Sequence, residues 1–116
     1  MHPIYFALVG LAAALVAFRM LMRRGRVSAT DARRLVADGA LLLDVRTPAE
    51  FDAGHLEGAQ NVAVQQLAAA LEGLGPKARP VVVYCQSGMR SRFAAATLRR
   101  AGFTAVHDLG PRAAWR

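Results

Sequence analysis

The stretch that decides the fold is VVVYCQSGMRS, residues 81–91. Its β-branched apolar start is typical of a buried strand, its centre is a polar loop with a glycine, and an alanine-rich segment predicts a helix over residues 91–101. The only cysteine of the chain, Cys85, directly follows the strand, and Arg90 lies five residues later. This order places the cysteine at the carboxyl end of a strand, where open α/β folds carry their functional loops.

The stretch predicts a nucleophile held in an anion-binding loop. Backbone N–H groups at a helix N-terminus, together with the positive charge of Arg90, favour a thiolate at Cys85 and attract a second anion to it. Gly88 lets the loop turn tightly because it has no Cβ. The alternative is a buried apolar cysteine. The glycine, the arginine and the strand–loop–helix context favour the nucleophile.

Strands and helices alternate on either side of this stretch, across residues 27–116. Thr47, Pro48 and Glu50 combine an N-cap, a proline at the first helical position and a reciprocal glutamate, so a helix is expected to start there. The alternation predicts an α/β domain with a mainly parallel sheet and helices on both of its faces. The other expected helices cover residues 28–36 and 67–74, and the expected strands cover residues 40–45, 61–64, 81–84 and 105–109.

The first 26 residues differ from the rest in composition. Residues 3–18 read PIYFALVGLAAALVAF without a charge, and the run through Met22 would form a helix of roughly 30 Å, long enough to cross a bilayer. This predicts a membrane anchor and a basic juxtamembrane segment over residues 1–26, preceding a domain over residues 27–116. The basic residues of this segment are Arg19, Arg23, Arg24 and Arg26.

The basic residues also predict an orientation. Because basic flanks stay on the cytoplasmic side, we expect a single-pass protein of the inner (plasma) membrane with its catalytic domain in the cytoplasm. A cleaved signal peptide and a buried helix of the domain are the alternatives. The absence of a basic residue before the apolar run argues against the first, and an apolar surface on all sides argues against the second.

Charge and cysteine content narrow the class of protein further. The chain has a net charge of +7, but four of its fifteen basic residues and none of its eight acidic residues fall in the first 26 positions. The remaining part is only mildly basic, which is not typical of a nucleic-acid-binding surface. One cysteine cannot form an intramolecular disulfide, consistent with a reducing compartment. No His, Cys or carboxylate cluster has metal-ligand spacing, so neither a metal nor another cofactor is expected.

Several short motifs together carry a resemblance to a known family. They resemble the rhodanese (thiosulfate sulfurtransferase) domain over most of residues 27–115. The resemblance implies a rhodanese-like fold preceded by one transmembrane helix, with Cys85 as the sulfur-accepting nucleophile. It also implies that the amides of residues 86–90, namely Gln86, Ser87, Gly88, Met89 and Arg90, bind the persulfide and the substrate oxyanion. The motifs are LDVR at 43–46, EF at 50–51, GHL at 54–56, GA at 58–59, Asn61 and YCQSGMRS at 84–91.

The activity that the resemblance implies is sulfur transfer in two half-reactions. The Cys85 thiolate attacks the outer sulfur of a small donor such as thiosulfate, and a thiol or cyanide acceptor then takes the sulfur from the persulfide. One alternative is a membrane-tethered persulfide carrier or interaction module that serves a protein sulfur acceptor. Another is a cysteine phosphatase or arsenate reductase. Only four residues separate Cys85 from Arg90, a loop that suits a sulfur better than a phosphate.

Three charged residues outside the loop are expected to give it structural support. Asp44 is the polar tip of a strand, and Arg46 and Glu50 are four residues apart. Such groups more often fix loops by hydrogen bonds than act as acid, base or substrate clamp. His55 is expected to be structural as well, because a pre-formed thiolate needs no general base.

Overall fold

The computed structural model describes residues 2–23 and 25–116, without the side chains of residues 21–23. Arg23 and Arg24 of the predicted basic juxtamembrane segment therefore lie outside the described residues and side chains.

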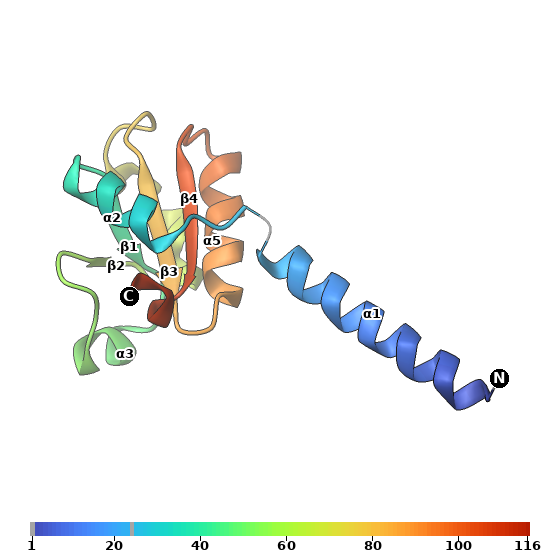
Figure 1. Ribbon diagram of the computed structural model, residues 1–116. Helices are drawn as coiled ribbons and strands as arrows, with labels where there is room; N and C mark the ends of the chain where they lie inside the picture. Colours follow the sequence, from blue (N-terminus) through green and yellow to red (C-terminus); the bar gives the residue numbers. More distant parts are fainter. Residues whose placement is uncertain (1, 24) are drawn as a thin grey trace.

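A four-stranded parallel sheet forms the centre of the domain (Figure 1). Its strands lie in the order β2-β1-β3-β4, and each neighbouring pair is parallel. Helices connect the strands, as the alternating sequence predicts, and the α/β fold is confirmed. The strands are β1 (Leu41–Asp44), β2 (Gln60–Asn61), β3 (Val81–Cys85) and β4 (Val106–Pro111), and the helices of the domain are α2 (Ala29–Ala37), α3 (Pro48–Ala53), α4 (Leu67–Ala70) and α5 (Met89–Arg100).

The two central strands are buried on both faces. Alternate side chains of β3 enter different halves of the core, since neighbouring residues of a strand point to opposite sides of the sheet. Val83 and Cys85 pack in one cluster with Leu98 of α5, whereas Tyr84 packs in the other with Ala32 of α2. Helices therefore cover both faces of the sheet, and the position of Cys85 is set by a strand without a solvent-exposed residue.

The expected helix over residues 67–74 is less regular than the sequence suggests. It consists of one α-helical turn, α4, between 3-10 turns over Val64–Gln66 and Leu71–Leu74. Gly73 disfavours a regular α-helix in the second half. Leu67 and Leu74 are nevertheless buried against the sheet, so the segment has the packing role of a helix.

A hydrogen bond to the sheet holds the start of the domain, and packing against a helix holds its end. At the start, the Val27 N–H donates to the Asp108 carbonyl at 2.9 Å, so the entering chain lies along the outer edge of β4. At the end, a 3-10 turn over Arg112–Trp115 packs against α2. There Arg33 lies over the Trp115 ring and donates to the Trp115 carbonyl.

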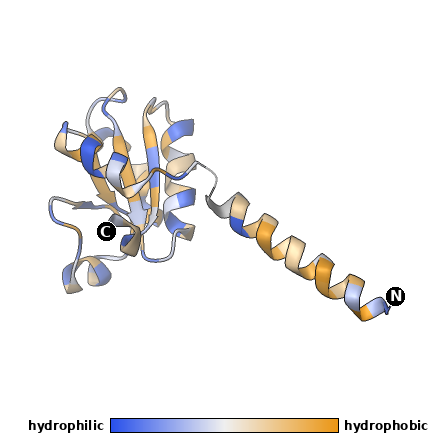
Figure 2. Cartoon of the chain, viewed as in Figure 1, coloured by the Kyte–Doolittle hydropathy of each residue, from blue (hydrophilic) through white to orange (hydrophobic). Residues whose placement is uncertain are grey.

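The N-terminal helix α1 (Pro3–Arg23) stands apart from the domain (Figure 1) and is apolar along most of its length (Figure 2). Residues Pro3–Met20 have a mean hydropathy of 1.8, and none of this stretch is buried. The complete exposure excludes a core helix of the domain. By length and composition α1 is able to cross a membrane, and a signal sequence has the same properties.

Candidate active site

Cys85 is the last residue of β3, and its side chain is buried at the carboxyl edge of the sheet. The Gly88 N–H donates a hydrogen bond to the Cys85 Sγ at 2.9 Å. Gly88 has a φ of 102°, a left-handed conformation that favours glycine, and it is the N-cap of α5. The turn after β3 therefore directs the backbone of the loop back toward the sulfur, as the sequence predicts.

The tip of the loop is exposed and carries backbone N–H groups that lack an acceptor among the described residues. Gln86 and Ser87 are exposed to solvent. Within the described part of the chain, their backbone N–H groups have no hydrogen-bond acceptor. The loop is held from below by the Ser91 hydroxyl, which donates to the Gly88 carbonyl at 3.1 Å. This arrangement leaves two amides next to the sulfur that are able to bind an anion or a second sulfur.

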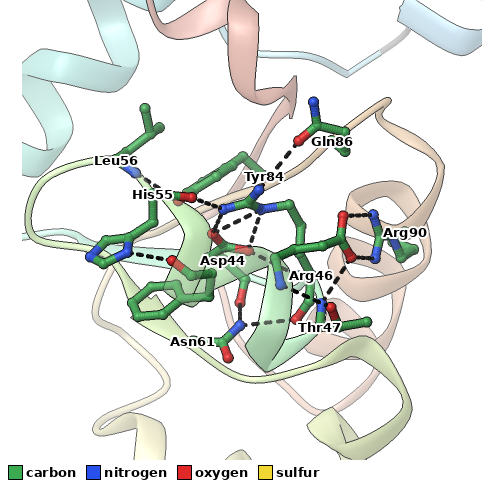
Figure 3. Close-up of polar contacts among 12 residues, drawn as sticks. Asp44, Arg46, Thr47, His55, Leu56, Asn61, Tyr84, Gln86 and Arg90 are labelled. Atoms are coloured by element: carbon green, nitrogen blue, oxygen red, sulfur yellow. Dashed lines mark hydrogen bonds and ion pairs between the residues drawn. The ribbon is translucent and has the colours of Figure 1, made fainter.

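The guanidinium of Arg90 is held by a carboxylate. The guanidinium forms two hydrogen bonds with Glu50 of α3, at 2.5 and 3.0 Å (Figure 3). The hydrogen bond from Arg90 is the main reason that the pKa of Glu50 falls to about 2, and the reciprocal contact raises the pKa of Arg90. Thr47 and Glu50 also form the predicted capping box. Glu50 thus joins the start of α3 to the loop and offsets part of its positive charge.

Asp44 and Arg46 form a buried ion pair beneath the loop. The Arg46 Nε and Nη2 donate to the Asp44 carboxylate at 2.8–3.1 Å, and both side chains are at most 2% exposed. Burial alone would raise the pKa of Asp44, but the hydrogen bonds from Arg46 outweigh it and hold this pKa below its usual value. Arg46 also donates to the Gly54 carbonyl and to the Gln86 Oε1, at 2.7 and 3.3 Å. It therefore connects the pair with the first residue of the loop.

Two further polar residues complete this network. The Asn61 side-chain amide donates to the carbonyls of Asp44 and Arg46, at 3.0 and 2.9 Å. The Tyr84 hydroxyl accepts a hydrogen bond from the Leu56 N–H at 3.1 Å, and burial raises the pKa of Tyr84 to about 12. These contacts hold the chain on either side of α3 against the sheet.

His55 lies on the opposite side of the network from Arg90 (Figure 3). Its Nδ1 donates to the Phe51 carbonyl at 2.8 Å, and its ring stacks on the Phe51 ring. The contacts are local and hold the end of α3, in agreement with the structural role that the sequence suggests.

A cleft of about 360 Å³ opens beside the loop. It is lined by Leu56, Gln86 and the C-terminal residues Arg112, Ala113, Trp115 and Arg116. No local sequence pattern places these C-terminal residues near the loop. The register between β3 and β4, which sets Pro111 opposite Cys85, brings them there.

Three other residues near the loop are not predicted from the sequence to belong to the site. Ser91 and Tyr84 belong to the motif YCQSGMRS, and their hydroxyl groups could have indicated hydrogen bonds that hold the loop. Arg26 was assigned to the juxtamembrane segment, but its side chain lies against Gly88 and Gly110. No local pattern marks this contact, because the three residues are far apart in the sequence.

Comparison with known proteins gives one consistent family. The family described as "Rhodanese-like domain" matches residues 28–110. The thiosulfate sulfurtransferase 16 of Arabidopsis thaliana chloroplasts is 40% identical over 101 residues, which cover 77% of this chain and 84% of that protein. The uncharacterized protein YqhL of Bacillus subtilis is 43% identical over 70 residues, or 60% of this chain. The match spans 55% of the length of YqhL.

A solved structure of a sulfurtransferase has the same fold as this domain. The human single-domain sulfurtransferase TSTD1 superimposes with a TM-score of 0.67 at 30% sequence identity. The alignment covers 79% of this chain and 92% of the human protein.

Proposed function

The chain belongs to the rhodanese-like domain family, and we propose from this premise that it is a sulfurtransferase that carries a sulfane sulfur as a persulfide on Cys85. The observation that carries the proposal is the hydrogen bond from the Gly88 N–H to the Cys85 Sγ. In the same loop, the amides of Gln86 and Ser87 have no acceptor among the described residues. A backbone donor to the sulfur stabilises negative charge on it, which is the reactive form of a cysteine.

The first half-reaction forms the persulfide. The Cys85 thiolate attacks the outer sulfur of thiosulfate, the sulfur–sulfur bond of the donor breaks, and sulfite leaves with the bonding electron pair. The new outer sulfur is then close to the N–H groups of Gln86 and Ser87. In the second half-reaction, cyanide or a thiolate attacks this outer sulfur, and the Cys85 thiolate is released. The net result is transfer of one sulfur atom without a redox cofactor.

In this proposal the loop amides bind the transferred sulfur, and the side chain of Arg90 has a separate electrostatic role. The amides of Gln86, Ser87, Gly88, Met89 and Arg90 surround the transferred sulfur. The Arg90 guanidinium, which Glu50 holds in place, adds positive charge at the mouth of the loop. Asp44 and Arg46 hold the strand tip and Gln86, so they support the loop without taking part in bond formation.

The decisive experiment is the intact mass of the chain after incubation with thiosulfate. We expect a gain of one sulfur atom that a reductant removes, with release of one equivalent of sulfite. Because Cys85 is the only cysteine, Cys85→Ser is a matched control. A hydroxyl has nearly the size of the thiol but is a far poorer sulfur acceptor. Sulfite release by the serine variant above trace level would contradict the assignment of the nucleophile.

A second candidate function is a tethered carrier that passes its sulfur to a protein acceptor. It is favoured by two exposed apolar side chains directly after the loop, Met89 at 51% and Phe93 at 67% exposure, one turn apart on α5. A protein acceptor would cover these side chains while it attacks the persulfide. A carrier forms the persulfide once but turns over slowly with cyanide or small thiols, whereas an enzyme turns over with both.

We also propose that residues 1–26 anchor the domain of residues 27–116 on the cytoplasmic face of the membrane. The support is the length and exposure of α1 and the basic residues that follow it. Protease added outside intact cells, or spheroplasts of a bacterium with an outer membrane, should spare the domain. Its digestion would reverse the orientation, and a shortened chain in a soluble extracytoplasmic fraction would establish a signal peptide.

A further inference from the structure

The side chain of Arg26 lies in a groove formed by two glycines. A Cβ at Gly110 would lie 2.8 Å from the Arg26 Nε and 3.0 Å from its Cζ. A Cβ at Gly88 would lie 3.3 Å from the same Cζ and closer still to a terminal nitrogen. Both glycines have positive φ, 83° and 102°. The two positions without side chains thus make room for one guanidinium next to the loop that holds Cys85.

Among the described residues, no direct ion pair neutralises the charge of this guanidinium. Within residues 2–23 and 25–116, no carboxylate lies within 4 Å of its nitrogen atoms. Its Nε is buried and has no hydrogen-bond partner in the same part of the chain. The Asp108 carboxylate accepts from the Gly110 N–H at 2.8 Å. It interacts with the charge of Arg26 only beyond ion-pair distance, and burial still raises the pKa of Asp108. By contrast, Arg90 shares two hydrogen bonds with Glu50.

Arg26 is also close enough to the sulfur for its charge to matter. Gly88 is the link, because its N–H contacts the Cys85 Sγ while its Cα faces the guanidinium. Bond lengths then place the guanidinium within about 8 Å of the sulfur. At this separation two unit charges change an equilibrium or a rate by roughly twofold in bulk water and by roughly thirtyfold at a site shielded from water. For a guanidinium that water partly screens, we expect a factor of about five.

From this juxtaposition we propose that Arg26 is a positioning residue of the active site. It holds the Gly88 backbone against the sulfur and supplies the unpaired positive charge that draws an anionic sulfur donor to Cys85. The inference rests on the proposed function only for the identity of the anion. It follows that Arg26, three positions after the end of α1 at Arg23, forms part of the sulfur site.

The test compares a charged with a neutral reagent at the single cysteine of the full chain in an uncharged detergent. Iodoacetate and iodoacetamide both alkylate the Cys85 thiolate with loss of iodide, but only iodoacetate is attracted by a positive charge. We expect Arg26→Met to lower the iodoacetate-to-iodoacetamide rate ratio about fivefold, and Arg26→Lys to retain most of it. The KM for thiosulfate should rise by a similar factor in Arg26→Met, with a smaller change in kcat.

The matched control is Arg79→Met. Arg79 precedes β3 at the opposite end of the sheet and donates to the Gly39 carbonyl, so this variant loses the same charge far from the loop. Its rate ratio should equal that of the wild type. An unchanged ratio in a folded Arg26→Met variant, or an equal fall in Arg79→Met, would overturn the inference.

A second variant keeps the inference testable if Arg26→Met fails to fold. Gly110→Ala retains the arginine but fills the groove with a Cβ, so the guanidinium must move away and the rate ratio should fall. An unchanged ratio in this variant would also overturn the inference. Alkylation does not require sulfur transfer. Failure of the wild type to release sulfite would therefore contradict the proposed function alone, while the alkylation ratio decides the role of Arg26.

Discussion

Replacing Arg46 by methionine should destabilise the domain more than any other single change in the support of the loop. Arg46 is 2% exposed, and its partner Asp44 is fully buried. Methionine fills most of the space of the arginine stem but donates no hydrogen bond. The Asp44 carboxylate then stays buried without its guanidinium, and the Gly54 carbonyl and Gln86 side chain each lose a donor.

The size of the effect follows from the burial. Breaking a buried ion pair by removing one partner costs about 3–5 kcal/mol, because an uncompensated charge remains. A small domain has a total stability of about 5–15 kcal/mol. With a urea dependence of about 1.5 kcal/mol per molar, the unfolding midpoint should fall by about 2–3 M.

The effect of pH has a definite sign. In the wild type the pKa of Asp44 is lowered, so the stability from the pair is complete above the ordinary aspartate range and is lost as the pH falls through the lowered value. In Arg46→Met, burial without the guanidinium raises the pKa of Asp44. Protonation then removes the buried charge, and the difference between the two proteins should shrink from pH 7 toward pH 4.

The assay is urea unfolding followed by the fluorescence of Trp115, the only tryptophan, which packs against the core cluster beneath α2. Adding Asp44→Asn to the Arg46→Met variant should recover part of the loss, because no charge is left unpaired. If Arg46→Met lowered the free energy of unfolding by less than about 1 kcal/mol, as solvent-exposed ion pairs do, the reasoning would be refuted. A difference that grows at low pH would refute it as well.

Three further changes test other parts of the structure. Glu50→Gln should lower the KM for thiosulfate about twofold, because the charge of Arg90 is no longer offset; steady-state kinetics would contradict this if the KM rose. Since the pKa of Glu50 is about 2, its charge should be constant above pH 5, and its contribution to stability should disappear only as the pH falls from about 4.5 toward 2. Leu98→Ala should cost about 2–5 kcal/mol in urea unfolding, since Leu98 is fully buried between α5 and the sheet; a cost under about 1 kcal/mol would mean that the core closes around the cavity. Thr47→Ala should cost about 1 kcal/mol because it removes half of a capping box, and an unchanged midpoint would show that the cap adds nothing beyond the contact of Glu50 with the loop.

Several features of this protein could be predicted from local sequence. The start of α3 is decided by three neighbouring residues, because a cap satisfies backbone donors within one turn. The strand, turn and helix around Cys85 follow from an apolar run, a glycine and an alanine-rich segment, and α1 follows from an uncharged stretch of membrane length. The bounds of the elements around Cys85 shifted by one or two residues, whereas the strand expected over residues 61–64 is only Gln60–Asn61. Cys85 is the end of β3 rather than the first loop residue, and α5 begins at Met89 rather than Ser91.

Other features depended on which strands are neighbours. Arg90 and Glu50 are forty residues apart, as are Arg46 and Gln86, and these pairs meet because β1 and β3 lie side by side in register. Likewise Arg26 reaches Gly88 only because the chain enters along the edge of β4. Local periodicity determines which residues form a strand and which of its faces is buried, but strand order results from packing the whole core. The sequence alone therefore predicted the kind of site and its candidate nucleophile. The tertiary structure decided that Glu50 holds Arg90 and that Arg26, from the start of the domain, lies beside the loop without an ion pair to any described carboxylate.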